Sequence, residues 1–399
     1  MRGLLKRSTS IFLACLLVLS VSQHAFAEEK QAELAEEAAA AILMEADTGR
    51  VLYEKNSEES LPPASMTKIM TMLLIMEAID EGKIDYEDKV VTSEYAASMG
   101  GSQIFLEPGE EMTVRDMLKG IAVASGNDAS VAMAEHIGGS EEKFVEMMNK
   151  RAEELGLENT HFTNTNGLPV ENHYTSAKDL ALMARELLKH EKITSFTGIY
   201  EDYLRQGTDD EFWLVNTNRL VKFYPGVDGL KTGFTQEAKY GLVATAKKQN
   251  MRVISVIMGA TTPKTRNSQT TSLLDYAFNH YDIQPLYDKD HVIDRAAVEK
   301  GDASHVTGVL GSRISLLIQK GLKLEDISEK VEMNKNLKAP IKKGETIGKF
   351  VVEKDGEVLA ETDIVAREDV KEATWWGLFK RTLAKMSGID AGSNEKESE

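Results

Sequence analysis

The chain has 399 residues, of which 42% are hydrophobic, so it is long enough for about two domains with a sizeable buried core. Its formal net charge of −17 argues against a nucleic-acid partner, because such a partner requires a basic surface. The acidic balance is otherwise typical of a soluble surface and predicts no particular ligand.

The first 27 residues have the pattern of a secretory signal. Three basic residues lie among the first seven, an apolar run covers 11–21, and Ala25-Phe26-Ala27 has the small residues of a signal-peptidase site. The apolar run is too short to span a bilayer as a stable helix. We therefore expect export, with cleavage before Glu28.

The single cysteine, Cys15, lies within this signal. The residues before it, Phe12-Leu13-Ala14, fit a lipoprotein signal poorly, so lipidation at Cys15 is the less favoured alternative. The mature protein would then contain no disulfide, and a large core must supply its stability.

Residues 28–38 are charged and rich in alanine, which predicts a loose leader. Two strands are predicted at 42–45 and 51–54, with a glycine-containing turn between them. Pro62-Pro63 then begin a helix, as proline does in first turns. Its residues are apolar on nearly every side through Met76, so we expect a central, buried helix.

Regular patterns continue to about residue 281. Ser176 and Asp179 have the spacing of a capping box, which predicts the start of a helix. Further helices are predicted at 114–136, 141–155 and 273–281, and strands at 240–246 and 251–258.

From about residue 284, short apolar runs alternate with turns, as in a small β domain. The runs 347–353 and 357–360 flank Asp355-Gly356, which is a strong hairpin signal. We therefore expect a large domain over 39–283 and a β domain over 284–369.

The C-terminal segment predicts an amphipathic helix over 370–388 and a polar tail over 389–399. An apolar face with interleaved basic residues is typical of helices that lie on a membrane surface. A helix docked on the protein's own body is the alternative. The face consists of Trp376, Phe379, Leu383 and Met386, widened by Trp375 and Leu378, and the basic residues are Lys380, Arg381 and Lys385.

Ser65-Met66-Thr67-Lys68 is a Ser-x-x-Lys motif at the start of the predicted buried helix. Two other copies, at 140–143 and 393–396, lie in polar segments. Side chains three residues apart share one helix face, so Ser65 and Lys68 should lie together. Serine is a weak nucleophile that needs a base, and lysine can be that base only if burial or another cation lowers its pKa.

Two more triplets follow. Ser125-Gly126-Asn127 begins 60 residues after Ser65, and Lys231-Thr232-Gly233 begins 106 residues after Ser125. Each triplet alone is unremarkable, and Ser-Gly-Asn is common in turns. Together, in this order and in an exported chain, the three motifs resemble those of the serine penicillin-binding proteins and class A β-lactamases.

The sequence is most similar to the serine D-alanyl-D-alanine carboxypeptidases, which are low-molecular-mass penicillin-binding proteins, and among them to the sporulation-associated type of Bacillus-like bacteria. The resemblance covers roughly residues 38–370 and the terminal helix. One departure is Asn166, because many relatives have histidine before Gly167-Leu168, and we assign that position no catalytic role. Matching segments are 64–68, 105–109, 124–129, 159–162, 167–168 and 229–233.

The resemblance implies an α+β fold: a β-lactamase/transpeptidase-like domain with a five-stranded antiparallel sheet and helices on both of its faces. A helical subdomain would carry Ser125. The β domain that follows would hold this body away from the membrane.

The resemblance also implies three catalytic residues. Ser65 would attack the carbonyl of the penultimate D-alanine and form an acyl-enzyme, Lys68 would take its proton, and Ser125 would relay a proton to the leaving D-alanine. The backbone N–H groups of Ser65 and Phe234 would form the oxyanion hole. The substrate-binding residues would be Asn127, Lys231, Thr232, Gly233 and Phe234.

The partners that the resemblance implies are peptidoglycan stem peptides as substrates and β-lactam antibiotics as covalent inhibitors, with the enzyme at the outer face of the cytoplasmic membrane. It implies no cofactor and no metal. The sequence contains neither the His-Glu-x-x-His pattern nor the paired cysteines of zinc sites.

A class A β-lactamase is the nearest alternative. Those enzymes have a glutamate four residues before an asparagine, between the second and third motifs, and none of the seven asparagines in that interval has one here. A D,D-endopeptidase with the same site stays open. A non-catalytic wall-binding protein that retains the fold is the alternative from another class, and covalent labelling by penicillin would separate it from an enzyme.

Overall fold

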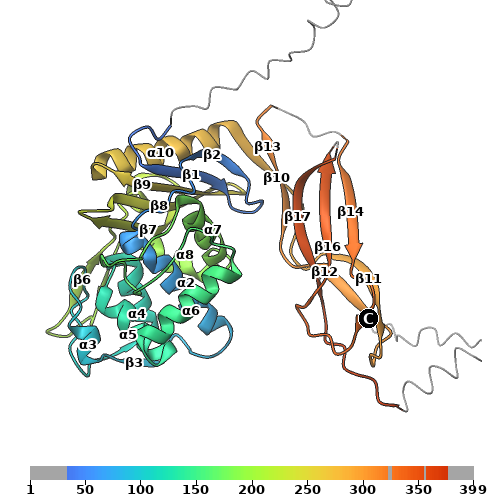
Figure 1. Cartoon of the computed structure of the whole chain (residues 1–399), viewed down its shortest axis with the longest axis horizontal. Coiled ribbons are helices and arrows are strands. Elements are labelled where there is room, and N and C mark those ends of the chain that lie inside the picture. Colours follow the sequence, from blue (N-terminus) through green and yellow to red (C-terminus); the bar gives the residue numbers. More distant parts are fainter. Residues whose placement is uncertain (1–33, 322–325, 355, 376–399) are drawn as a thin grey trace, which may run out of the picture.

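The computed structural model describes residues 34–321, 326–354 and 356–375. It consists of a larger domain of helices and a sheet, followed by a β-rich domain (Figure 1). Across the described residues, no helix is both long and apolar enough to cross a membrane. The predicted secretory signal, most of the leader, the apolar face that begins at Trp376 and the polar tail lie outside the described residues.

A five-stranded antiparallel sheet forms the centre of the larger domain, as predicted. Strand β7 lies at one edge, which leaves one side of this strand free of a neighbour within the described sheet. The strand order is β2 (Val51–Lys55), β1 (Ala40–Glu45), β9 (Met251–Ala260), β8 (Lys239–Lys248) and β7 (Val227–Thr235).

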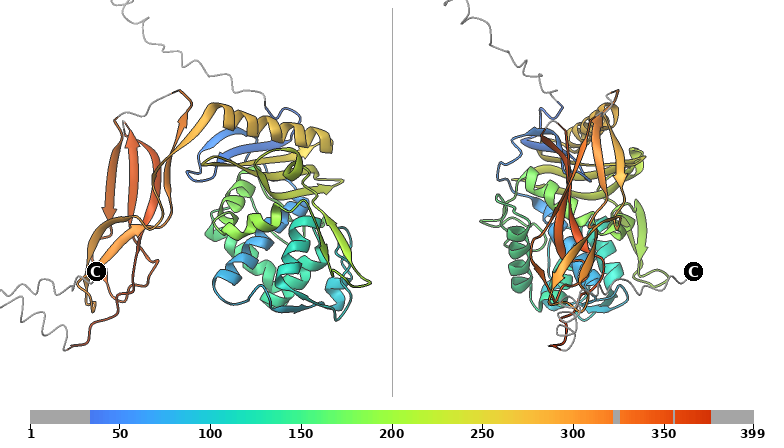
Figure 2. Two further views of the ribbon diagram at one scale, coloured as in Figure 1. Left: turned by 180° about the vertical axis from the view of Figure 1, so that it is seen from behind. Right: turned by 90° about the vertical axis from the view of Figure 1, so that its right-hand side faces the viewer.

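Helices cover both faces of this sheet, and Figures 1 and 2 show α10 on the opposite side from the other large helices. α10 (Pro263–His280) begins at Thr262, whose side chain accepts a hydrogen bond from the N–H of Thr265. α7 (Ala177–Leu187) packs against β9 and β1 on the other face. The Ser176 side chain accepts a hydrogen bond from the N–H of Asp179, so the predicted cap of α7 is confirmed.

The central helix is α2 (Lys68–Asp80), preceded by a 3₁₀ turn, η1 (Ala64–Thr67). Ten residues of α2 are buried, which confirms the prediction of a central, buried helix from residues that are apolar on nearly every side. It lies in a core shared by the inner face of the sheet and the helical subdomain. That subdomain contains α3 (Glu94–Ala97), α4 (Val114–Lys119), α5 (Asn127–Gly138) and α6 (Glu141–Glu154).

The predicted continuous helix over 114–136 is wrong. α4 is followed by a π-helical turn, η2 (Gly120–Ala124), and the helix is interrupted at Ser125 before α5 begins. Ser125 has a φ of 65°, in the left-handed region that non-glycine residues rarely adopt. The apolar periodicity continues on both sides of this break, so it gave no sign of the interruption.

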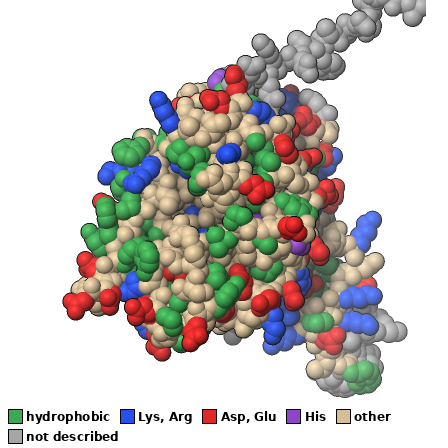
Figure 3. Space-filling view, turned by 60° about the vertical axis from the view of Figure 1, so that its left-hand side comes forward, with side chains coloured by type: hydrophobic (Ala, Val, Ile, Leu, Met, Phe, Trp, Pro, Cys, Tyr) green, Lys and Arg blue, Asp and Glu red, His purple; other side chains and the backbone are tan. Residues whose placement is uncertain are grey.

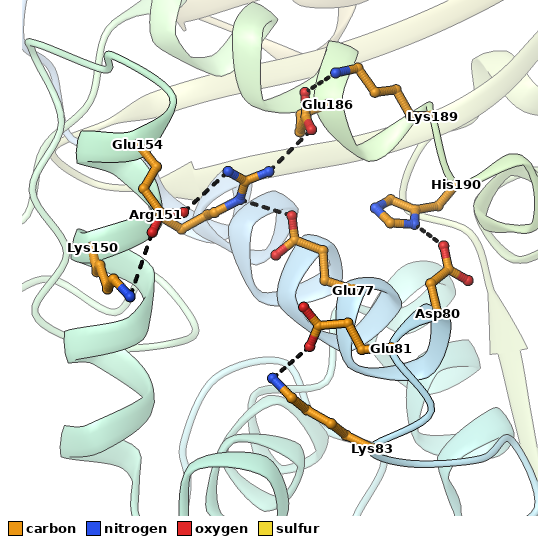
Figure 4. A network of polar contacts seen from close by, with 10 residues as sticks. All are labelled: Glu77, Asp80, Glu81, Lys83, Lys150, Arg151, Glu154, Glu186, Lys189 and His190. Carbon is orange, nitrogen blue, oxygen red and sulfur yellow. Dashed lines mark hydrogen bonds and ion pairs between the residues drawn. The ribbon is translucent and has the colours of Figure 1, made fainter. Parts of the chain in front are cut away.

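Arg151 of α6 ties the central helix to two others (Figure 4). Its Nε donates to Glu77 of α2 at 2.8 Å, and its Nη2 donates to Glu186 of α7 at 3.1 Å. Partial burial raises the pKa of Glu77, and the guanidinium of Arg151 opposes this rise. The network holds α2, which begins with Lys68, against α6 and α7.

The short elements complete the larger domain. Strands β3 (Lys89–Val91) and β4 (Glu111–Thr113) pair with each other, as do β5 (Glu201–Leu204) and β6 (Phe212–Val215). The short helices are η3 (Glu191–Ile193), α8 (Thr194–Thr197) and α9 (Leu220–Phe223). On the face of the molecule in Figure 3, basic and acidic side chains are interspersed with hydrophobic ones and form no continuous basic patch.

The second domain has its own apolar core. The predicted hairpin is confirmed, because β16 (Thr346–Lys354) pairs antiparallel with β17 (Glu357–Ala366). The sheet has the order β14 (Ser328–Met333), β16, β17, β12 (His305–Leu310), β11 (Val292–Glu299) and β15 (Leu337–Lys338).

A two-stranded ribbon joins the two domains. β10 (Tyr281–Tyr287) begins directly after α10 and pairs with β13 (Ile314–Gln319). Ile283 and Leu317 of this ribbon belong to the core beneath α10, whereas Ile314 and Leu316 belong to the core of the β domain. The boundary that we drew after residue 283 therefore falls within β10.

Candidate active site

The 3₁₀ turn η1 and the first residue of α2 bring the Ser-x-x-Lys motif together. The Lys68 Nζ donates a hydrogen bond to the Ser65 Oγ at 3.1 Å. Lys68 is fully buried, whereas Ser65 is partly exposed. A substrate can therefore reach the hydroxyl, while the amine beside it is shielded from water.

Two oxygens fix the amine of Lys68 from other segments. Its Nζ donates to the Asn127 Oδ1 at 2.6 Å and to the backbone carbonyl of Asn166 at 2.7 Å. Burial holds the pKa of Lys68 well below its usual range, and the charge of Lys231 lowers it further while Asp128 opposes the shift. In its neutral form the amine has two N–H groups, which can serve the oxygens of Asn127 and Asn166, and its lone pair can then accept the proton of Ser65.

The second motif lies at the helix interruption. The hydroxyl of Ser125 is buried and has no hydrogen-bond partner within the described structure. Asn127 begins α5, and its Nδ2 donates to the carbonyl of Gly100 at 2.7 Å. Asp128 accepts hydrogen bonds from the N–H groups of Ile104 and Leu106, which attaches the neighbouring loop to the start of α5.

The third motif lies on the edge strand β7. Lys231 is buried, and its Nζ donates to the carbonyl of Thr232 at 3.2 Å. Burial lowers the pKa of Lys231 to about 7, with a further contribution from Arg266. The Thr232 Oγ1 donates to the Thr217 Oγ1 at 2.7 Å. Phe234 is half exposed and stacks on Tyr240, with 4.3 Å between ring centroids.

Two glycines allow close packing around the turn that carries Ser65. A Cβ at Gly233 would lie 2.8 Å from the Pro63 carbonyl oxygen. A Cβ at Gly167 would lie 1.8 Å from the Ala64 carbonyl oxygen, and Gly167 has a φ of 85°. Both positions therefore require glycine, and η1 lies tightly between β7 and the segment around Gly167.

His173 supports the same turn through a hydrogen bond to Thr67. The His173 Nδ1 accepts a hydrogen bond from the N–H of Thr163 at 3.0 Å, so its Nε2 carries the proton. Nε2 then donates to the Thr67 Oγ1 at 2.7 Å, and that hydroxyl donates to the Ala64 carbonyl at 2.9 Å. Burial lowers the pKa of His173 to about 4, with a smaller contribution from His161, so the ring is neutral at pH 7.

Among the predicted site residues, hydrogen bonds join Lys68 to Ser65 and Asn127, and the charge of Lys231 lowers the pKa of Lys68. Ser125 is linked to these residues through the segment that it shares with Asn127. The sequence did not indicate the parts played by Thr217, His173 and the main chain of Asn166. The polar atoms of the Asn166 side chain bond elsewhere: its Oδ1 accepts from the N–H of Leu168, and its Nδ2 donates to the Met99 sulfur. The one signal in the sequence was Gly167, because a glycine allows the segment around it to approach the turn of Ser65 closely.

The described residues contain no group of three or more His, Cys, Asp or Glu side chains that could hold a metal ion. The arrangement is that of a nucleophilic hydroxyl beside a buried amine, with a second buried amine on a strand edge. It fits acyl transfer from a substrate that carries a negative charge near the reacting carbonyl.

Comparison with known proteins gives two family matches. A family described as D-alanyl-D-alanine carboxypeptidase, peptidase S11, matches residues 25–262, and one described as the C-terminal domain of penicillin-binding protein 5 matches 281–372. D-alanyl-D-alanine carboxypeptidase DacF of Bacillus subtilis is 59% identical over 382 residues, covering 95% of this chain and 98% of the relative. DacC of Escherichia coli is 34% identical, covering 94% of each chain.

Solved structures give the same picture. Penicillin-binding protein 5 from Haemophilus influenzae is 34% identical, with a TM-score of 0.67 over 84% of this chain and 98% of that one. Penicillin-binding protein D2 from Listeria monocytogenes, in its ampicillin-bound form, is 31% identical. Its TM-score is 0.52, and the similarity covers 61% of this chain and 98% of that one.

Proposed function

This chain belongs to the S11 family of serine D-alanyl-D-alanine carboxypeptidases, as its motifs predicted, and from that premise we propose that Ser65 is the residue acylated by the substrate. The substrate is the D-alanyl-D-alanine end of a peptidoglycan stem peptide, and the product lacks its last D-alanine. The observation that carries the proposal is the fully buried Lys68 amine, 3.1 Å from the Ser65 hydroxyl.

In the acylation step, the Ser65 Oγ attacks the carbonyl carbon of the penultimate D-alanine while the neutral Lys68 Nζ accepts its proton. The N–H groups of Ser65 and Phe234 stabilise the oxyanion. The peptide bond then breaks, and the leaving nitrogen of the terminal D-alanine takes a proton relayed through Ser125. The buried Ser125 hydroxyl supports this role, because within the described residues it makes no hydrogen bond that would have to break first.

The terminal carboxylate of the substrate binds Lys231 and Thr232, and Asn127 helps to hold the leaving residue. The low pKa of Lys231 supports this assignment, because an arriving carboxylate would raise that pKa again and so bind the protonated amine favourably. Gly233 lets the strand approach the turn of Ser65 closely. Water then attacks the acyl-enzyme ester, with Lys68 again as the base, and Ser65 recovers its proton.

The test of this proposal uses a β-lactam and a peptide in parallel. Intact-protein mass spectrometry should show one drug molecule added to the wild type and none added to Ser65→Ala, and D-alanine release from diacetyl-Lys-D-Ala-D-Ala should disappear in the variant. Labelling that persists in Ser65→Ala would overturn the assignment. The β-lactam is expected to react because the Listeria relative has been solved with ampicillin bound.

Deacylation separates a carboxypeptidase from a β-lactamase. A peptidyl ester has lost its D-alanine, which leaves room for water, whereas a penicilloyl ester keeps its tethered thiazolidine ring in the way. The penicilloyl adduct should therefore persist while peptide turns over, and a barrier difference of about 4 kcal/mol would already give roughly a thousandfold difference in rate. Rapid penicillin hydrolysis without D-alanine release would reverse this conclusion.

We also propose that the enzyme is exported and attaches to the outer surface of the cytoplasmic membrane through its C-terminal segment. The support is the sequence alone: the signal pattern of the first 27 residues and the Trp/Phe/Leu face with interleaved lysines and arginine. Trp376→Glu combined with Phe379→Glu should move the protein from sedimented lipid vesicles to the supernatant, with activity on soluble peptide unchanged. Co-sedimentation equal to that of the wild type would contradict this anchor.

A further inference from the structure

A pocket opens directly beside the turn that carries the nucleophile. One wall is Pro62–Ala64, so the pocket reaches the residue immediately before Ser65. The second wall is the segment from Gly167 to Val170, and the third is formed by Thr235, the last residue of β7, and Glu237, two residues beyond it. His173, which supports the turn through Thr67, also lines this pocket, and none of the catalytic or substrate-binding roles proposed above uses the pocket.

The direction of the substrate determines which of its groups would enter. This step rests on the proposed function, in which the terminal carboxylate lies at Lys231 and Thr232. β7 is an edge strand, and an extended peptide binds such an edge by adding a strand. If the stem runs antiparallel to β7, its preceding residues point toward Thr235 and Glu237. The residue before the two D-alanines lies about 7 Å from the carboxylate end, since an extended residue spans about 3.3 Å.

The chemistry of the pocket suits a long side chain with a positive end. Pro62, Leu168 and Val170 supply apolar walls, and the side chains of Leu168 and Val170 are exposed to solvent. Glu237 is exposed, and its carboxylate has no ion pair or hydrogen bond to any other part of the described structure. An alkyl chain can cover the apolar wall while its ammonium reaches the carboxylate.

We propose that this pocket binds the side chain of the diamino acid that precedes D-Ala-D-Ala in the stem peptide, with the terminal ammonium paired with Glu237. Such an amine is charged only while it is free, because cross-linking converts it to an amide. The pocket therefore makes the enzyme selective for stems whose diamino acid has not yet been cross-linked. Glu237 is a specificity residue and does not touch the reacting atoms.

Two substrates that differ only in this charge test the proposal. One is diacetyl-Lys-D-Ala-D-Ala, and the other carries only the α-acetyl group, so its side-chain amine is free. The wild type should show a kcat/KM about two- to fivefold higher for the free amine, which is the range expected of an exposed ion pair. This preference should shrink as salt is added, because salt screens exposed charges.

The variant Glu237→Gln should lose the preference and retain the kcat/KM for the diacetylated peptide, which also checks that the site is folded. Glu171→Gln is the matched control: it removes one exposed carboxylate just past the pocket wall without changing the lining, and it should keep the preference. A preference that survives in Glu237→Gln, or disappears equally in Glu171→Gln, would overturn the proposal. Failure of the proposed function would look different, because wild type would then release no D-alanine from either peptide.

Discussion

The two domains differ in what they bury. The catalytic domain buries several ionisable side chains, among them Lys68, Asp128 and Lys231. In the described part of the β domain, Ser315 is the only buried polar side chain, and the rest of the core is apolar. The catalytic domain therefore holds ionisable groups out of water. The described part of the β domain is a sheet with a hydrophobic interior.

This difference separates stability from catalysis. Moving an amine out of water disfavours its charged form, so a buried lysine weakens the fold unless its surroundings compensate. The same burial lowers the pKa of Lys68 and makes a neutral base available. We infer that the catalytic domain gives up stability at its centre to obtain this chemistry, whereas substitutions in the β domain should change stability without changing the reaction.

The largest effect is expected at the base. Lys68→Arg keeps a positive charge at every accessible pH and cannot take the proton of Ser65. A general base contributes about 10²- to 10⁴-fold, so the acylation rate by a β-lactam should fall by about that factor. Stopped-flow acylation, with circular dichroism as a check on folding, measures this.

The chain offers a matched control for that variant. Ser140 and Lys143 form a second Ser-x-x-Lys motif, but Ser140 caps α6 and Lys143 is exposed. Lys143→Arg should acylate at the wild-type rate. Normal acylation by Lys68→Arg would show that another group removes the proton. The burial of Lys68 would then not serve to provide a neutral base.

The next effect tests the β domain. Ile364 is fully buried in its core, and Ile364→Ala should lower the free energy of unfolding of that domain by about 2–4 kcal/mol. Val358 in the same strand β17 is half exposed, so Val358→Ala should cost far less. Both variants should keep the wild-type kcat/KM on a soluble tripeptide.

Calorimetry of the β-lactam adduct can assign the transitions. A covalent ligand at Ser65 stabilises only the domain that holds it, so the transition that stays in place on acylation belongs to the β domain. Ile364→Ala should shift that transition and leave the other in place. If Ile364→Ala also lowered kcat/KM, the β domain would affect the reaction, and stability and catalysis would not be separated between the two domains.

The sequence predicted those parts of the fold that depend on local pattern. The burial of α2, the cap at Ser176 and the hairpin of β16 and β17 each follow from residues close together in the chain. The three motifs predicted which residues would meet, because a family resemblance carries tertiary information that periodicity lacks.

The parts that were not predicted depend on contacts between distant segments. Ser125 interrupts the predicted helix with a φ of 65°. The triplet Ser125-Gly126-Asn127 is common in turns, but the apolar periodicity on both sides favoured a continuous helix. The carbonyl of Asn166 reaches Lys68 across 98 positions of the sequence, and a main-chain atom leaves no trace in residue type. His173 acts on Ser65 only through Thr67 and Ala64, so its spacing from the motif carries no signal.

The smallest effect is expected at Lys231, and it tests directly whether a buried charge weakens the catalytic domain. The Lys231 pKa is about 7 in the folded protein and 10.5 when the side chain is fully solvated, so the unfolded chain binds more protons between these values. Wild-type stability should therefore rise as pH increases from 7 to 10.5, and the full penalty should be present below pH 7.

Lys231→Met removes that penalty with a side chain of similar length. At pH 7 it should raise the free energy of unfolding by about 1–3 kcal/mol, since replacing a buried charge by an apolar group is often stabilising by this much. The gain over wild type should shrink toward pH 10.5, because wild-type Lys231 is then neutral in the folded state and loses its proton in the unfolded chain as well. Its kcat/KM should fall at the same time, because the substrate carboxylate loses its cation.

Urea unfolding of wild type and Lys231→Met at about pH 7 and about pH 10 measures the difference in the free energy of unfolding. A variant that is less stable than wild type at pH 7 would mean that Lys231 is held by interactions that outweigh its burial, and the centre of the catalytic domain would then not be a site where stability was given up.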